Sequence, residues 1–397
     1  MILVMSITCS FAQKKNVSTA RNRALMETPD FKGARDLIKL ALEDETTKNQ
    51  ATTWYVAGLI GYQENEAEIK KMMLSQKHDI DKKGEAIMES YKYFVKAWEL
   101  DQLPDAKGRV RPRHRDIKAK VSEYFTNQAN LVAYGAHLYE KKNFERTIEV
   151  FETYLGIPKL PMMNNELVLD STYYMIKYYT AFAAINAKKN DLALKHLLEM
   201  KTAGYEENAV LQLIYQEYAD RKDTVNYVKI LKEGFERFPA EPFYLQNLIN
   251  HYIFTNQSEE AVKYLNAAIA KEPTVAQYHL VKGKLDELMA KYDDARAAFD
   301  KAIELDPKLA DAHAEIGRLF YNKAVRMSDD ANNIKDIKLY NAERVKIDKV
   351  FAEAIPHYKK AIELNPDEFE YKKTLRNLYY RLKMDKEYDA LNKAMNE

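Results

Sequence analysis

The clearest repeat in this chain is TVAQYHLVKGKLDELMAKYDDARAAFDKAIELDP, residues 274–307. Its last residue is Pro307, and prolines also stand at Pro273 and Pro239, so that the three prolines recur at a constant interval of about 34 residues. Residues of similar character recur in the same frame: Gly283, Ala295, Phe299 and Ala302 in this stretch, and Leu248, Tyr252, Ala261 and Ala268 in the one before. We interpret residues 208–309 as three copies of one structural unit.

Each residue type in this frame has a physical role. Two helices that cross closely need small side chains at the crossing, and residues such as Gly283 and Ala295 supply them. Bulky neighbours such as Phe299 fill the surrounding space. Proline has no N–H and cannot continue the preceding helix, so it ends each unit. One such hairpin cannot bury its own apolar stripe, so we expect stability to come from stacking several.

The pattern of small residues at positions 8, 20 and 27, aromatic residues near 11 and 24, and proline at 32 resembles the tetratricopeptide repeat (TPR) family. The resemblance implies an all-α, right-handed solenoid of about eight helical hairpins with a capping pair. It further implies a protein that binds other proteins and has no catalytic activity.

We predict five segments. They are a signal-peptide remnant at 1–12, degenerate repeats with one inserted long hairpin at 13–158, a joint at 159–171, a regular array with a second inserted long hairpin at 172–368, and a capping hairpin at 369–397. The long hairpins follow from spacing: about 20 extra residues lie between Gly58 and Ser90, and about 25 lie before Ala354. Their thin apolar stripes are expected to join the arms: Ile69, Met72, Met73 and Ile80 in one, and Met327, Ile334, Ile337, Leu339, Val345 and Ile347 in the other.

About a dozen residues at the start of the chain are apolar, and the residues after them are polar. An apolar run of this length is too short to span a bilayer. Ser10 and Ala12 occupy the small-residue places of a secretory signal that would be cut before Gln13. The prediction is a periplasmic or cell-envelope protein. Two alternatives are a lipid anchor on Cys9, which is the only cysteine, and a buried or frayed terminal segment.

Composition and motifs exclude several functions. The net charge of +1 provides no global field that would recruit nucleic acid or an anionic membrane. The sequence has no glycine-rich phosphate loop, no His-Glu-x-x-His and no Gly-x-Ser-x-Gly. The start of a calcium loop at Asp79 fails because Ser90 stands where a bidentate glutamate is needed. We therefore predict no enzyme activity, no cofactor and no metal site.

The remaining candidate for function is a surface. In TPR arrays the first helix of each hairpin lines a concave groove, and the resemblance places these residues there: Tyr178, Tyr179, Phe182, Gln212, Gln216, Gln246, Asn247, Asn250, Lys284 and Arg318. Amides can bind a peptide backbone, and aromatic rings supply contact area at low entropic cost. The alternative is a solvated face that binds nothing, or only the chain's own tail. The family's two-carboxylate clamp is missing, since Gln246, Gln277 and Val281 stand at three of its positions.

A run of cations follows Pro104: Lys107, Arg109, Arg111, Arg113, Arg115, Lys118 and Lys120. It is either a solvated loop or a docking patch for an acidic partner or a lipid headgroup. For the whole chain we predict an envelope adaptor that binds an extended segment of a partner protein in the groove. The alternative is a structural subunit of an envelope assembly or secretion complex, held through the long hairpins.

Overall fold

The computed structural model describes residues 2–396, with side chains from residue 13 to residue 395. Within that part the regular elements are 19 α-helices and two short 3-10 turns, so the predicted all-α fold is confirmed. The chain forms two compact units, Met1–Arg221 and Lys222–Glu397.

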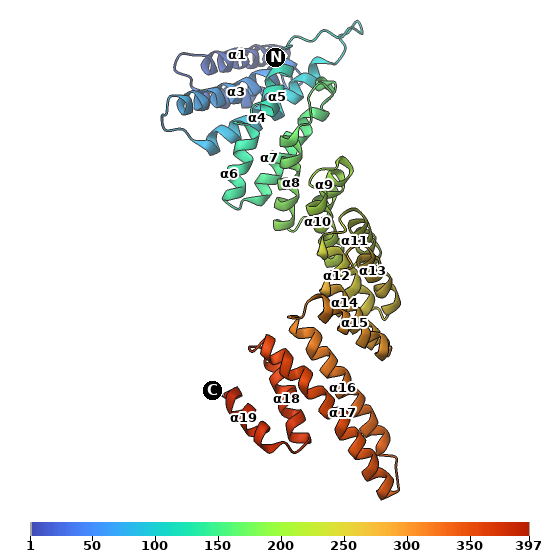
Figure 1. The fold of residues 1–397 in the computed structure, drawn as a ribbon. Coiled ribbons are helices and arrows are strands. Elements are labelled where there is room, and N and C mark those ends of the chain that lie inside the picture. The colour runs from blue at the N-terminus through green and yellow to red at the C-terminus, as the bar shows by residue number, and fades with distance from the viewer. Residues whose placement is uncertain (1, 397) are drawn as a thin grey trace. The chain divides into compact units, whose positions relative to one another are not determined.

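In the first unit most helices pack against the next one in the chain (Figure 1). The elements are α1 (Ile2–Ala24), α2 (Phe31–Glu43), α3 (Ala51–Met73), α4 (Ile80–Asp101), α5 (Ile117–Thr126), α6 (Leu131–Glu140), α7 (Phe144–Gly156), the 3-10 turns Ile157–Lys159 and Pro161–Met163, α8 (Ser171–Asn186), α9 (Asn190–Ala203) and α10 (Glu207–Asp220).

The second unit continues the same pattern of paired helices. Its elements are α11 (Thr224–Arg237), α12 (Pro242–Phe254), α13 (Ser258–Lys271), α14 (Ala276–Leu288), α15 (Tyr292–Leu305), α16 (Ala310–Ala331), α17 (Ile337–Leu364), α18 (Phe369–Arg381) and α19 (Asp385–Asn396). The last pair buries Leu375, Leu378 and Tyr379 in the core that it shares with α17.

The periodic prolines end helices as predicted. Helices α11, α13 and α15 end at Arg237, Lys271 and Leu305, and each of these residues lies two positions before a proline of the repeat frame. The residue that follows each helix still donates its N–H to the carbonyl four residues back, at 2.8 or 2.9 Å. The missing N–H of proline then prevents a further turn.

Small residues and aromatic rings meet inside the hairpins. A methyl group added to Gly283 would lie 2.4 Å from the Phe299 ring, and one added to Gly135 would lie 2.1 Å from the Phe151 ring. The same contact joins Gly58 to Phe94 in the first long hairpin. The glycines therefore serve close packing of the two helices, as the frame predicted.

The turn inside each hairpin also repeats. Lys188, Lys222, Asn256 and Ala290 recur at the same interval as the prolines, and all have positive φ, between 57° and 59°. The sequence does not reveal this because none of the four is glycine, the residue that adopts this conformation most readily.

The first long hairpin is held largely by polar groups, and the predicted apolar stripe is only partly correct there: Ile69 and Ile80 are partly buried, and Ile80 packs against the core. Met72 and Met73 are exposed, whereas Glu64, Asn65, Glu68 and Lys83 are buried. Glu64 binds Arg35 of α2 at 2.6 Å and Lys82 of α4 at 3.2 Å. Glu68 accepts the backbone N–H of Asp79 at 3.0 Å. These ion pairs satisfy the buried carboxylates as α2, α3 and α4 pack together.

In the second long hairpin the apolar stripe is only partly correct. Ile347 is buried, and Met327 and Ile334 are partly buried in the same core. Ile337, Leu339 and Val345 are 57–68% exposed, and Ala324 and Ala331 fill the seam in their place. Helix α17 runs through Pro356 without ending.

The structure differs from the prediction at residues 159–171. We predicted a joint there, but Met162 and Met163 are buried in the core that joins α5, α7 and α8. The boundary between the two compact units lies instead between Arg221 and Lys222. Because its apolar side chains pack into the core of the first unit, this irregular stretch does not separate two units.

Candidate partner-binding surface

The three aromatic residues predicted to line the groove lie on α8 in the first unit. Tyr178 and Phe182 meet edge to face at 4.7 Å between ring centroids, and Tyr179 packs on Tyr139 of α6 at 5.7 Å. Tyr179 is 42% exposed, so part of its ring is open to solvent. Tyr178 thus contacts rings of its own helix, and Tyr179 joins α8 to α6.

The two predicted glutamines on α10 make bonds along their own helix. The Gln212 amide donates to Asn208 at 3.3 Å, and the Gln216 amide donates to Asp220 at 2.7 Å. Each bond joins residues one helical turn apart. It uses one amide hydrogen, so the second hydrogen and the oxygen of the amide need other partners.

A cavity of about 370 Å³ opens between α12 and α14 in the second unit. Gln246 and Asn250, both predicted from the sequence, stand exposed at its rim on α12. Leu245, Ile249 and Leu265 line it as well and are at most 6% exposed. Its remaining lining residues are Pro242, Gln277, Tyr278 and Val281. We call this cavity the α12–α14 pocket.

The chemistry of the α12–α14 pocket is uncharged. Its lining combines three amides and a phenol with aliphatic side chains and contains no ionisable group other than Tyr278. Burial raises the pKa of Tyr278, and the nearby Glu272 carboxylate raises it further, so its hydroxyl stays neutral. The pocket can therefore exchange hydrogen bonds with a peptide backbone over an apolar floor.

Asn247 does not line this pocket. Its amide donates to the carbonyl of Phe243 on the same helix at 2.8 Å. Gln277 and Tyr278 take part instead. The sequence could identify Gln277 only as a departure from the carboxylate clamp, because its role depends on where α14 lies beside α12.

Lys284 and Arg318 are engaged in ion pairs between hairpins. Lys284 of α14 binds Glu315 of α16 at 3.1 Å, and Arg318 of α16 binds Glu287 of α14 at 2.7 Å; Arg318 also binds Glu315 on its own helix at 2.6 Å. The two carboxylates are only 12–13% exposed, so the pairs help to hold α14 against α16. The predicted contact of these two cations with a partner remains a prediction.

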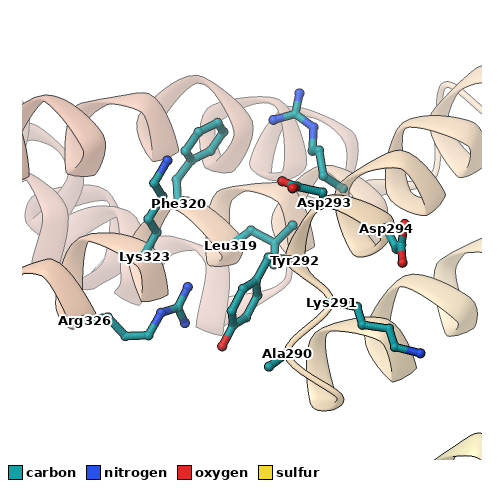
Figure 2. Close-up of a pocket in the computed structure, with 10 residues that line it drawn as sticks. Ala290, Lys291, Tyr292, Asp293, Asp294, Leu319, Phe320, Lys323 and Arg326 are labelled. Carbon is teal, nitrogen blue, oxygen red and sulfur yellow. The ribbon is translucent and has the colours of Figure 1, made fainter.

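A larger cavity, of about 640 Å³, was not predicted (Figure 2). It lies between the α14–α15 turn and the stretch of α16 from Leu319 to Arg326. The Arg326 guanidinium lies 4.0 Å from the centroid of the Tyr292 ring, and Figure 2 shows Lys323 one turn away on α16. No sequence signal indicates this cavity, because it depends on how α16 lies beside that turn.

The first five cations of the run lie in the loop between α4 and α5, which we call the cationic loop (residues 102–116), and the last two, Lys118 and Lys120, lie on α5. Asp105 binds Arg109 at 3.1 Å. Arg111, Arg113 and Arg115 are exposed, and among the described residues their side chains form no ion pair. The acidic partner expected at Arg109, Arg111, Arg113 and Arg115 remains a prediction.

The described residues contain no group of three or more His, Cys, Asp or Glu side chains placed to hold a metal ion. In the same part of the chain no helix is long and apolar enough to cross a membrane. The side chains of residues 1–12, including Cys9, lie outside the described part, and so do the side-chain features of the predicted signal remnant.

Comparison with known proteins identifies the repeat. Residues 276–309, which form α14 and α15, match the model of the tetratricopeptide repeat. A solved TPR repeats protein from Bacteroides fragilis is 20% identical over 63% of this chain and 97% of that one, with a TM-score of 0.31. The C-terminal part of a TPR repeat-containing protein from Cytophaga hutchinsonii is 18% identical over 66% of this chain and 93% of that one, with a TM-score of 0.42.

MamA from Desulfovibrio magneticus is 15% identical over 51% of this chain and 99% of that one, with a TM-score of 0.35. No curated protein matches the sequence. These identities and TM-scores are too low to relate the function of any of the three proteins to this chain.

Proposed function

This chain is a tetratricopeptide-repeat protein, and we propose that it is a non-catalytic scaffold that binds an extended segment of a partner protein in the α12–α14 pocket. The observation that carries the proposal is the composition of that pocket: amide groups of Gln246, Asn250 and Gln277 around a floor that includes Leu245 and Ile249. An extended peptide offers unpaired N–H and C=O groups to the amides and an apolar side chain to the floor.

The size and the charge of the pocket define the segment it would bind. A volume of about 370 Å³ lies at the lower end of the range for ligand pockets, which suits one side chain and its flanking backbone. The lining carries no cation, so an acidic tail has no counter-charge there. Binding of an uncharged apolar segment should depend little on salt.

The triple variant Q246A/N250A/Q277A should weaken peptide binding at least tenfold, because several hydrogen bonds to the peptide are lost at about 0.5–1.5 kcal/mol each. The peptide is obtained by selecting a displayed random library on the purified chain. Its affinity is then measured by fluorescence anisotropy for the parent and the variant. The melting temperature should not change, since Gln246 and Asn250 are exposed.

The matched control is Q76A/N333A, which removes amides from two exposed positions outside the pocket. Unchanged affinity in the triple variant would discard the pocket as the binding site. The structural-subunit alternative would then be favoured, since the second long hairpin carries the exposed Ile337, Leu339 and Val345 and borders the 640 Å³ cavity. Replacing Arg326–Lys349 by a short Gly/Ser bridge should in that case abolish recovery of the partner.

We further propose that this scaffold works in the bacterial cell envelope. The support is the apolar run that ends at Ala12, together with the packing of α1: Val17, Ala20 and Ala24 are buried and all follow the predicted cut. N-terminal sequencing of the protein recovered from a bacterial envelope fraction should begin at Gln13. A protein that keeps Met1 and stays in the cytosolic fraction would contradict this localisation.

A further inference from the structure

The cationic loop has an unbalanced charge. Between residues 102 and 116 it carries five cations, Lys107, Arg109, Arg111, Arg113 and Arg115, and two acids, Asp105 and Asp116, which gives a net charge of +3. Figure 1 shows the loop as a coil that extends beyond the helices between α4 and α5.

The carboxylates in and beside the loop are bound internally. Asp105 accepts the backbone N–H groups of Lys107 and Arg109 at 2.8 and 3.0 Å, which hold its pKa below the usual value. Asp101, at the end of α4, accepts the N–H groups of Arg113 and His114 at 2.9 and 2.8 Å.

The far end of the loop is fixed to α3. The Tyr55 hydroxyl donates to Asp116 at 2.7 Å, and the His114 ring stacks on Tyr55 at 4.3 Å between centroids. The backbone is thus anchored at both ends while the guanidinium groups of Arg111, Arg113 and Arg115 face solvent. The anchoring lowers the entropy that the loop would lose on binding.

Two apolar side chains stand among these cations. Leu103 is 61% exposed and Val110 is 50% exposed. Cations at the headgroups with aliphatic groups at the acyl boundary are the arrangement of an interfacial membrane contact. An acidic protein would use the cations but gain less from the aliphatic pair.

We propose that the cationic loop is a docking site for an anionic lipid surface. Lipid phosphates pair with Arg111, Arg113 and Arg115, while Leu103 and Val110 enter the interface. This site is independent of the α12–α14 pocket, so either can fail alone.

The test is co-sedimentation of the full chain with vesicles of phosphatidylcholine containing about 30% phosphatidylglycerol, with pure phosphatidylcholine as the reference. Each cation near such a surface contributes about fivefold, so R111Q/R113Q/R115Q should lower binding on the order of a hundredfold. Raising the salt from about 50 to about 500 mM should weaken parent binding strongly. The variant K32Q/K39Q/K92Q removes three exposed cations from α2 and α4 and should lower binding far less.

A second variant separates lipid from protein. L103S/V110S keeps every charge and should lower vesicle binding about tenfold, whereas binding to poly-glutamate should not change. Equal vesicle binding by the parent and R111Q/R113Q/R115Q overturns the proposal. So does a loop that binds poly-glutamate but not the vesicles, since that result identifies an acidic protein as the occupant.

Discussion

Replacing Gly283 with valine should destabilise the second unit by about 3 kcal/mol. A methyl group at this position would lie 2.4, 2.6 and 2.9 Å from three atoms of the Phe299 ring, and the Phe299 side chain is fully buried between α14 and α15. The ring cannot move aside without displacing Leu280 and Ile316, which share its core. Urea unfolding followed by circular dichroism measures the loss.

The control is Gly156→Ala, where the added methyl group meets no atom within 4 Å. That variant should be neutral or gain up to about 1 kcal/mol, since alanine favours a helix over glycine. In a double-mutant cycle, Phe299→Ala should cost less in the Gly283→Val background than in the parent, because it also relieves the overlap. Additive losses would show that the two residues do not compete for space.

Replacing Arg35 with leucine should destabilise the first unit by about 3 kcal/mol. Arg35 binds Glu64 and Glu89, both at 2.6 Å, and the Glu64 side chain is only 6% exposed. Burial alone would lower the pKa of Arg35, but the two carboxylates raise it above its ordinary value. Without the guanidinium, Glu64 keeps Lys82 at 3.2 Å as its ion-pair partner, and a buried charge is under-compensated.

Lys39→Leu is the matched control, because Lys39 lies on the same helix and is exposed. Its melting temperature should stay near that of the parent. An Arg35→Leu variant as stable as Lys39→Leu at neutral pH would show that the buried carboxylates do not need this partner.

Spacing alone predicted the helix crossing in both long hairpins. In the regular pairs Gly283–Phe299 and Gly135–Phe151, the glycine and the ring that it contacts have the same separation in the sequence. The separation is larger in Gly58–Phe94 and Gly317–Tyr358, yet glycine and ring still meet. The insertions therefore lengthen the arms without changing the contact. Because a close helix crossing admits only a small residue opposite the ring, the pairing of glycine and ring is kept when residues are inserted into the arms.

The sequence could not show which polar contacts hold the arms of the first long hairpin. In a sequence, a glutamate is assigned to the surface unless its cationic partner is known. The partner of Glu64 comes from α2, a helix of the preceding hairpin.

The lining of the α12–α14 pocket could be predicted only in part. Gln246 and Asn250 follow from the repeat frame, but Leu265 and Tyr278 line the cavity only because of how three helices lie together.

The most direct test of the proposed function is site-specific photo-cross-linking with the library-selected peptide. A photoreactive residue is placed singly at Gln246, which borders the α12–α14 pocket, or at Lys323, which borders the larger cavity. We predict a peptide adduct from position 246, suppressed by excess unlabelled peptide, and none from position 323. An adduct from position 323 with none from position 246 would contradict the account and place the binding surface beside the second long hairpin.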